Sequence, residues 1–172
     1  MPAPHRIVMV VGILDREDSR PRIRMMSYFA DAFADIWPHA TFEVAPCFFW
    51  PWQKARITAY ANALATQYND GIPTLFIGYS LGGVIASHIA GGLPNSVGVV
   101  SFCSPHRLAR VWGMQDTFTG PQLHTMGITD IWVPFLLGHK GYRLVRGGHW
   151  LDYILGPTPA HTLARLTSQI VT

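Results

Sequence analysis

The chain has 172 residues and a net charge of +3; 49% of its residues are apolar and only 13% are charged. This composition excludes a disordered chain, and the length suits one domain that spans residues 1–172. The basic residues are scattered except between Arg16 and Arg24, which argues against a nucleic-acid partner, and no apolar run approaches the ~18 residues of a transmembrane span.

Six short apolar runs along the chain predict β-strands. The first, third and fourth runs are almost continuously apolar instead of alternating with polar residues, which is typical of strands that are buried on both faces of a sheet. The predicted strands are Arg6–Val11, Thr41–Ala45, Pro73–Gly78, Val97–Phe102, Leu123–Gly127 and Tyr142–Val145.

Segments with helical spacing of apolar residues lie between and after these strands. The first helix is predicted to start at Ser19 and Pro21 and to end before Pro38, and the last has Thr158 as its cap and Pro159 in its first turn. Two more are predicted at 57–68 and 81–90. Alternating strands and helices imply right-handed crossovers, and hence a parallel sheet between two helical layers, a three-layer α/β/α sandwich.

The strongest motif is the pentapeptide Gly78-Tyr-Ser-Leu-Gly82, which is a G-x-S-x-G sequence between a predicted strand and a predicted helix. This arrangement is a nucleophile elbow, in which a serine occupies a strained backbone conformation and glycines relieve crowding on both sides. The pattern predicts Ser80 as a catalytic nucleophile. The backbone N–H of Leu81, at the start of the following helix, would stabilise an oxyanion.

A serine nucleophile requires a base, and His149 is the best-placed histidine. It lies in Gly147-Gly-His-Trp150, after the last predicted strand and before the final helix. Functional residues of parallel α/β sheets collect beyond the carboxyl ends of the strands, which is where this loop begins. His139 and His161 are the alternatives, whereas His88 lies inside the helix that follows the elbow and is expected to point away.

The base in turn requires a carboxylate that orients it and stabilises the imidazolium. Asp130 follows the fifth predicted strand and stands on the loop next to that of His149. Asp116 precedes that strand, and Asp152 follows His149 by only three residues, so both are weaker candidates. If His149 is the base, activity should rise as its imidazole loses a proton.

The elbow, followed along the chain by Asp130 and then by His149, resembles the α/β-hydrolase superfamily, whose triad runs serine, acid, histidine. Gly127-x-x-Asp130-x-x-Val133-Pro134 resembles its acid loop, and Gly148-His149 its histidine loop. The resemblance implies the core sheet of that superfamily without its first two strands, with the strands in the order second, first, third, fourth, fifth, sixth. In that order Cys47 and Cys103 lie three strand spacings, ~14 Å, apart, which is too far for a disulfide.

The resemblance also implies a second oxyanion donor on the loop after the first strand. The histidine that often precedes this donor is absent from Val11-Gly-Ile-Leu14, which leaves the N–H of Ile13, or alternatively of Leu14. The interval from Ser104 to Gln122, where the superfamily often inserts a lid, is long enough only for a helical turn or two. We therefore expect a shallow, exposed site. An apolar substrate pocket is predicted from residues on or near loops at this edge: Leu14, Tyr79, Phe49, Trp50, Trp132 and Trp150. Taken singly, these aromatic side chains are more readily explained as cover for the sheet.

These features predict a small serine hydrolase that cleaves carboxylic esters of small, apolar molecules through an acyl-enzyme. An amidase, a thioesterase or an acyltransferase would use the same triad, and a hydrolase-like fold without activity could serve as a binding module. No sequence motif implies a metal or an organic cofactor. The N-terminal region lacks the features of a signal peptide, which favours a cytoplasmic protein, although a mature secreted form would look the same.

Overall fold

The centre of the protein is a six-stranded sheet in which every neighbouring pair of strands is parallel. The computed structural model describes residues 2–12, 20–47, 49–127, 130, 142–145 and 157–171. Within them the strand order is β2-β1-β3-β4-β5-β6, as expected from the resemblance. The strands are β1 Arg6–Val10, β2 Thr41–Ala45, β3 Thr74–Tyr79, β4 Ser96–Phe102, β5 Gln122–Gly127 and β6 Arg143–Val145.

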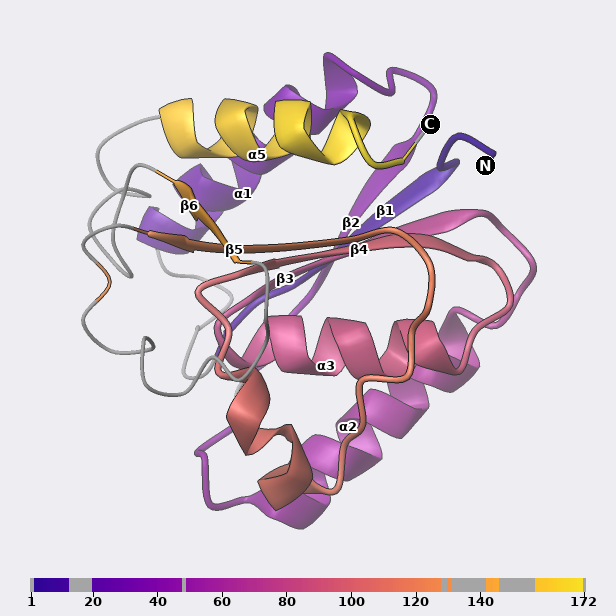
Figure 1. The fold of residues 1–172 in the computed structure, drawn as a ribbon, viewed down its shortest axis with the longest axis vertical. Coiled ribbons are helices and arrows are strands. Elements are labelled where there is room, and N and C mark those ends of the chain that lie inside the picture. The colour runs from indigo at the N-terminus through magenta and orange to yellow at the C-terminus, as the bar shows by residue number, and fades with distance from the viewer. Residues whose placement is uncertain are drawn as a thin grey trace.

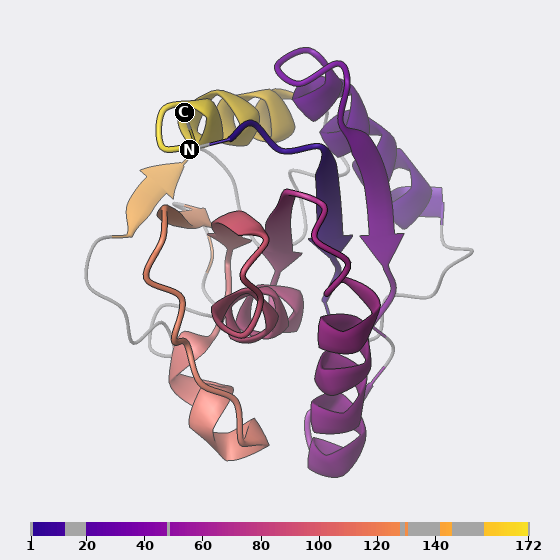
Figure 2. The same ribbon diagram turned by 90° about the vertical axis from the view of Figure 1, so that its right-hand side faces the viewer.

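Helices cover both faces of this sheet, so that the predicted three-layer α/β/α fold is confirmed (Figure 1). Helices α1 (Arg20–Ala34) and α5 (Thr158–Ser168) pack together on one face. The other face carries α2 (Lys54–Gln67), α3 (Leu81–Gly91) and a short 3₁₀ helix, η1 (His106–Trp112). Figure 2 shows η1 and α2 on the same side of the sheet as α3.

The apolar strands produce two cores because successive side chains of a strand point to opposite faces. Along β1, Ile7 and Met9 join the core beneath α1 and α5, whereas Val8 and Val10 join the core beneath α2 and α3. All four are almost fully buried, and each such side chain contributes ~1.5–3 kcal/mol by its burial. The continuous apolar runs of the sequence are thus explained by a sheet that is covered twice.

Arg6 fixes the amino-terminal edge of the sheet, opposite the candidate site. Its guanidinium donates to both carboxylate oxygens of Asp70, at 2.7 and 2.8 Å, and to the hydroxyl of Thr74. The hydrogen bonds from Arg6 lower the pKa of Asp70 to about 2. Perturbed pKa values often mark functional sites, but this pair joins β1 to the turn before β3 and has a structural role.

The element boundaries agree with the sequence predictions to within a few residues. The last helix differs at its cap, because Pro157 occupies that position and Thr158 is already the first helical residue. In the interval where the superfamily often inserts a lid, between Ser104 and Gln122, the 3₁₀ helix η1 is the regular element before β5, as the short length of the interval suggested. Both Cys47 and Cys103 are buried free thiols, so the prediction that they form no disulfide is confirmed. Within the described ranges, none of the helices has the length and apolar character needed to cross a bilayer.

Candidate active site

Ser80 occupies the sharp turn between β3 and α3, with φ of 54° and ψ of −126°. A non-glycine residue in this region is strained by 1–3 kcal/mol or so, and such strain concentrates at functional sites. The Ser80 N–H donates to the carbonyl of Phe102 at 3.0 Å, and the Ser80 carbonyl accepts from Gly83 N–H at 3.1 Å. The neighbouring strand β4 and the first turn of α3 therefore hold the serine in its strained conformation.

Two glycines of the motif allow α3 to pack directly against the strands. A Cβ on Gly78 would lie 2.2 Å from the Gly83 Cα, and a Cβ on Gly82 would lie 2.0 Å from the Val10 carbonyl oxygen. Neither position can hold a side chain without displacement of the backbone. The sequence explanation of the elbow, that glycines two residues on either side of the serine prevent collisions, is confirmed.

Of the predicted oxyanion donors, only Leu81 lies within the described residues. Leu81 is the first residue of α3; its side chain is fully buried, and the N–H groups of this first turn point out of the helix end. Ile13 and Leu14 lie outside the described residues. Gly12, just before them, is described, and a Cβ on it would lie 2.9 Å from the Ser80 Cβ. The chain after β1 thus passes directly beside the serine.

Asp130 is 3% exposed and lies beyond the carboxyl end of β5. Its N–H donates to the Gly127 carbonyl at 3.0 Å, and the Gly127 N–H points to the Cys103 Sγ at 3.5 Å. Cys103 has a φ of 50° and, with Ser80, is one of two non-glycine residues of positive φ in the described part of the chain. The tip of β4 therefore supports both the serine turn and the start of the acid loop, a role that the sequence did not reveal.

The remaining predicted site residues are placed only in part. His149, Trp132 and Trp150 lie outside the described residues, as does the alternative base His139. Tyr79 is buried on β3 and stacks on Phe102 with ring centroids 6.1 Å apart. Phe49 is partly buried against Tyr60, and Trp50 is 44% exposed.

Two other histidines are placed away from Ser80 by their own contacts. His161 stands on α5 with its Nδ1 3.7 Å from Asp35 Oδ2, in the layer of α1 and α5. His88, in the last turn of α3, has its Nδ1 3.2 Å from the Gln115 N–H, which donates to it. His88 therefore points away from the elbow, as predicted.

A buried chain of polar side chains was not predicted from the sequence. Ser101 Oγ on β4 lies 2.9 Å from His106 Nε2 and 2.6 Å from His124 Nδ1, and His124 Nε2 lies 2.8 Å from Gln122 Oε1. Gln122 Nε2 donates to the Phe118 carbonyl, which can only accept. No sequence motif links these residues, because a strand and a short helix bring them together.

When both histidines are neutral, the Phe118 carbonyl determines which partner donates in every hydrogen bond of this buried group of side chains. Gln122 Oε1 accepts from His124 Nε2–H, so His124 Nδ1 accepts from the Ser101 hydroxyl. The Ser101 oxygen then accepts from His106 Nε2–H. Ser101 is fully buried and its proton is already donated, so this group of residues joins η1 to β4 and β5 and does not offer a nucleophile.

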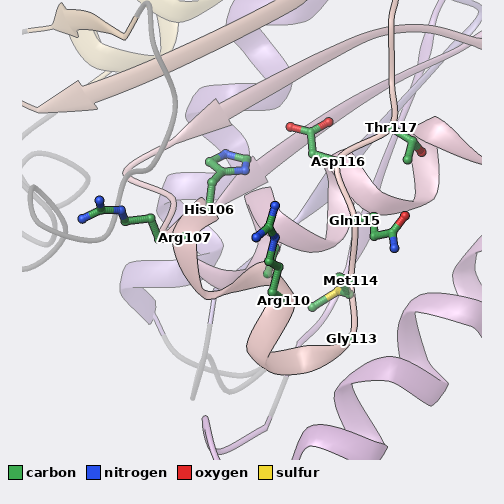
Figure 3. Close-up of a pocket in the computed structure, with 9 residues that line it drawn as sticks. His106, Arg107, Arg110, Gly113, Met114, Gln115, Asp116 and Thr117 are labelled. Atoms are coloured by element: carbon green, nitrogen blue, oxygen red, sulfur yellow. The ribbon is translucent and has the colours of Figure 1, made fainter.

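A cavity of ≈ 1030 Å³ opens beside η1 (Figure 3). His106 forms part of its wall, together with Arg107 and Arg110 from η1 and Gln115 and Asp116 from the segment that follows. The side chains of Arg107 and Arg110 leave η1 in different directions (Figure 3). The cavity is lined mainly by polar groups and differs from the apolar pocket predicted at the sheet edge.

No protein-family profile matches the chain, and it has no significant sequence match among curated proteins. Its structure is similar to that of a protein assigned to the α/β superfamily of hydrolases, from Xanthomonas campestris pv. campestris. That similarity has a TM-score of 0.69 at 16% identity and covers 96% of this chain and 99% of that one.

Two further solved structures show the same similarity. The esterase domain of a Rhodothermus marinus protein has a TM-score of 0.60 at 15% identity, with 98% of this chain and 88% of that chain covered. The type II thioesterase of the yersiniabactin pathway has a TM-score of 0.55 at 14% identity, with coverages of 98% and 94%. The chain therefore has the fold of the α/β-hydrolase superfamily.

Proposed function

We propose that the protein is a serine hydrolase that cleaves carboxylic esters, with Ser80 as nucleophile, His149 as base and Asp130 as the orienting acid. The observation that carries the proposal is the strained backbone of Ser80 at the start of α3. Strain at a serine on a strand–helix turn has no structural benefit of its own, since a glycine would occupy the same conformation at lower cost.

The position of Asp130 supports its proposed role as the acid that orients His149. It follows β5, which is separated from β3 by β4 alone, so the acid loop begins two strand spacings, roughly 10 Å, from the elbow. An imidazole fits between a hydroxyl and a carboxylate at such a separation. His149, on the loop after β6, would enter from the neighbouring position at the same edge of the sheet.

The chemistry follows from these roles. The Ser80 oxygen attacks the ester carbonyl carbon while His149 takes the hydroxyl proton, and the N–H groups of Leu81 and Ile13 stabilise the oxyanion. The bond to the alcohol then breaks, and His149 returns the proton to the leaving oxygen. Water then attacks the acyl carbon while His149 takes a proton from it; the bond to the Ser80 oxygen breaks, His149 returns the proton to that oxygen, and the carboxylic acid leaves.

A fluorophosphonate probe tests the nucleophile directly, because it reacts only with an activated serine. We expect labelling of the wild-type protein at Ser80 and loss of both labelling and ester hydrolysis in Ser80→Ala. The matched control is Ser27→Ala, an exposed serine on α1, which should keep both. If folded wild-type protein is not labelled, a hydrolase-like binding module becomes the better explanation.

The similarity to a type II thioesterase makes thioesters the second candidate substrate class. The attacking machinery is the same for both bonds, so substrate profiling must separate them. Matched oxygen esters and thioesters of one acyl group should be compared by kcat/KM. A preference for the thioester after correction for its faster spontaneous hydrolysis would favour this candidate over the esterase.

A further inference from the structure

Two tryptophans protrude from the loop between β2 and α2. Trp50 is 44% exposed and Trp52 is 69% exposed, and their rings stack with centroids 4.8 Å apart and planes 13° apart. Exposed apolar side chains that adjoin one another, unlike single scattered ones, often mark a surface that binds a partner or a membrane.

The loop is fixed, so the exposure of both rings is not a consequence of disorder. The Trp50 N–H donates to Gln53 Oε1 at 3.0 Å, and the Gln53 N–H donates back to the Trp50 carbonyl at 2.9 Å. The indole of the buried Trp112, at the end of η1, donates to the Pro51 carbonyl at 2.8 Å. The loop is thereby attached to η1 and presents its two rings outward.

Two cations follow this loop directly. Lys54 and Arg56 are exposed in the first turn of α2. Helix α2 is in turn attached to η1 through the Thr58 hydroxyl, which donates to the Trp112 carbonyl at 2.6 Å. We define the tryptophan–arginine face as the surface that carries Trp50, Trp52, Lys54 and Arg56.

Carboxylates are missing from the segment that builds this face. No Asp or Glu occurs between residues 44 and 69 or between 71 and 115. The oxygens of Asp116, which follows, are buried. The other acidic side chains of the described ranges belong to α1, to the turn after it, to β2, to the turn before β3 and to the acid loop. The segment that builds the face, from residue 44 to residue 69, therefore carries the positive charges of Lys54 and Arg56 and no carboxylate of its own.

We propose that the tryptophan–arginine face docks on an anionic lipid bilayer. Tryptophan prefers the boundary between headgroups and acyl chains, and clustered Lys and Arg are attracted to anionic headgroups. The stacked rings leave no gap between them for a nucleobase, which makes single-stranded nucleic acid the less suitable partner.

This docking goes beyond the proposed hydrolysis and does not require it. The face is built on the segment after the carboxyl end of β2, and Ser80 follows the same end of β3. A bilayer bound there would lie near the edge of the sheet where the candidate site is located. Lipid-borne or membrane-dissolved molecules would then reach that edge at a raised local concentration.

Co-sedimentation with phospholipid vesicles tests the docking without any substrate. We expect the wild-type protein to bind vesicles of mixed phosphatidylcholine and phosphatidylserine, to bind pure phosphatidylcholine at least ~10-fold more weakly, and to dissociate as salt screens the headgroups. Lys54→Gln with Arg56→Gln should lower binding by ~10-fold or more, and Trp52→Ser should separately lower it by ~5-fold or more.

Matched control variants test whether binding depends on this face or on the charge and exposed apolar area of the protein in general. Arg24→Gln with Arg165→Gln removes two exposed cations from α1 and α5, and Ile23→Ser with Leu144→Ser removes two exposed apolar side chains elsewhere. Both should bind like the wild type. Thermal unfolding must show that every variant is folded, and fluorophosphonate labelling should remain in all of them, so that failure of the docking is distinct from failure of the proposed function.

Three results would overturn the proposal: equal binding to neutral and anionic vesicles, loss of binding in the control variants to the same extent, or no binding to either vesicle. A single-stranded oligonucleotide and polyglutamate are included as alternative anions. Tryptophan-dependent binding to either one, without binding to anionic vesicles, would assign the face to that partner and reject the bilayer.

Discussion

At the scale of single residues, two serines near the tips of neighbouring strands have opposite environments. Ser80 turns sharply into α3, whereas Ser101 lies one residue before the end of β4 with its hydroxyl between two histidine rings. A search for serine–histidine pairs alone would select Ser101. Its complete burial and its fully used hydrogen bonds argue instead for a structural role.

Replacing Ser101 by alanine should therefore destabilise the protein without removing its reactivity. The substitution leaves buried nitrogens of His106 and His124 without the hydroxyl that bridges them, which costs ~1–3 kcal/mol of unfolding free energy. Chemical denaturation measures this loss, with Ser27→Ala as the neutral reference. Labelling of Ser101→Ala by the fluorophosphonate should persist. A folded Ser101→Ala protein that is no longer labelled would show that the wrong serine was chosen.

The sequence predicts the elbow at Ser80 but not the buried contacts of Ser101, because the two depend on different ranges of the chain. The elbow is local, and its glycines, serine and flanking periodicity fall within thirteen consecutive residues. The buried polar chain requires His124, 23 residues after Ser101, and a short helix whose position no pattern fixes. Local geometry can be predicted from the spacing of residues in the sequence, whereas contacts between strands become visible only in the folded sheet.

At the scale of elements, the elbow depends on close packing of α3 against the strands. Gly78 and Gly82 allow this approach, and a methyl group at either one would overlap with main-chain atoms at 2.2 and 2.0 Å. Main chain yields less readily than a side-chain end, so substitution at these positions should shift the helix that carries the serine.

Gly78→Ala and Gly82→Ala should each lower the unfolding free energy by at least ~1–3 kcal/mol, the usual cost of overpacking, and slow the labelling of Ser80. Gly92→Ala is the matched control, since its Cβ would find its nearest atom at 3.7 Å and its φ of −96° is compatible with alanine. Thermal melts and labelling rates compare the three. Equal melting temperatures for all three variants would mean that α3 can move away from the strands without loss of stability.

At the scale of the whole molecule, alternation and right-handed crossovers predict the parallel sheet, whereas its strand order, β2-β1-β3-β4-β5-β6, is predicted from the resemblance to the α/β-hydrolase superfamily. The boundaries of β2 match the prediction residue for residue, because a turn precedes Thr41 and Pro46, which has no N–H to donate, follows Ala45. The contact of Trp112 could not be predicted in this way. Its buried indole donates to the Pro51 carbonyl, and the periodicity of the sequence gives no sign of this contact between segments 61 residues apart.

The strand order has a direct chemical consequence for the two cysteines. Cys47 follows β2 and Cys103 follows β4, with β1 and β3 between those strands, and both side chains are fully buried. We expect an aromatic disulfide reagent to react with neither thiol in the native protein, or at least ~100-fold more slowly than in denaturant, where both should react. A reductant should leave the melting temperature unchanged. Fast reaction of one thiol in the native state would show that a strand tip opens locally, and stabilisation that a reductant removes would mean that the two cysteines can meet, which this order of strands does not allow.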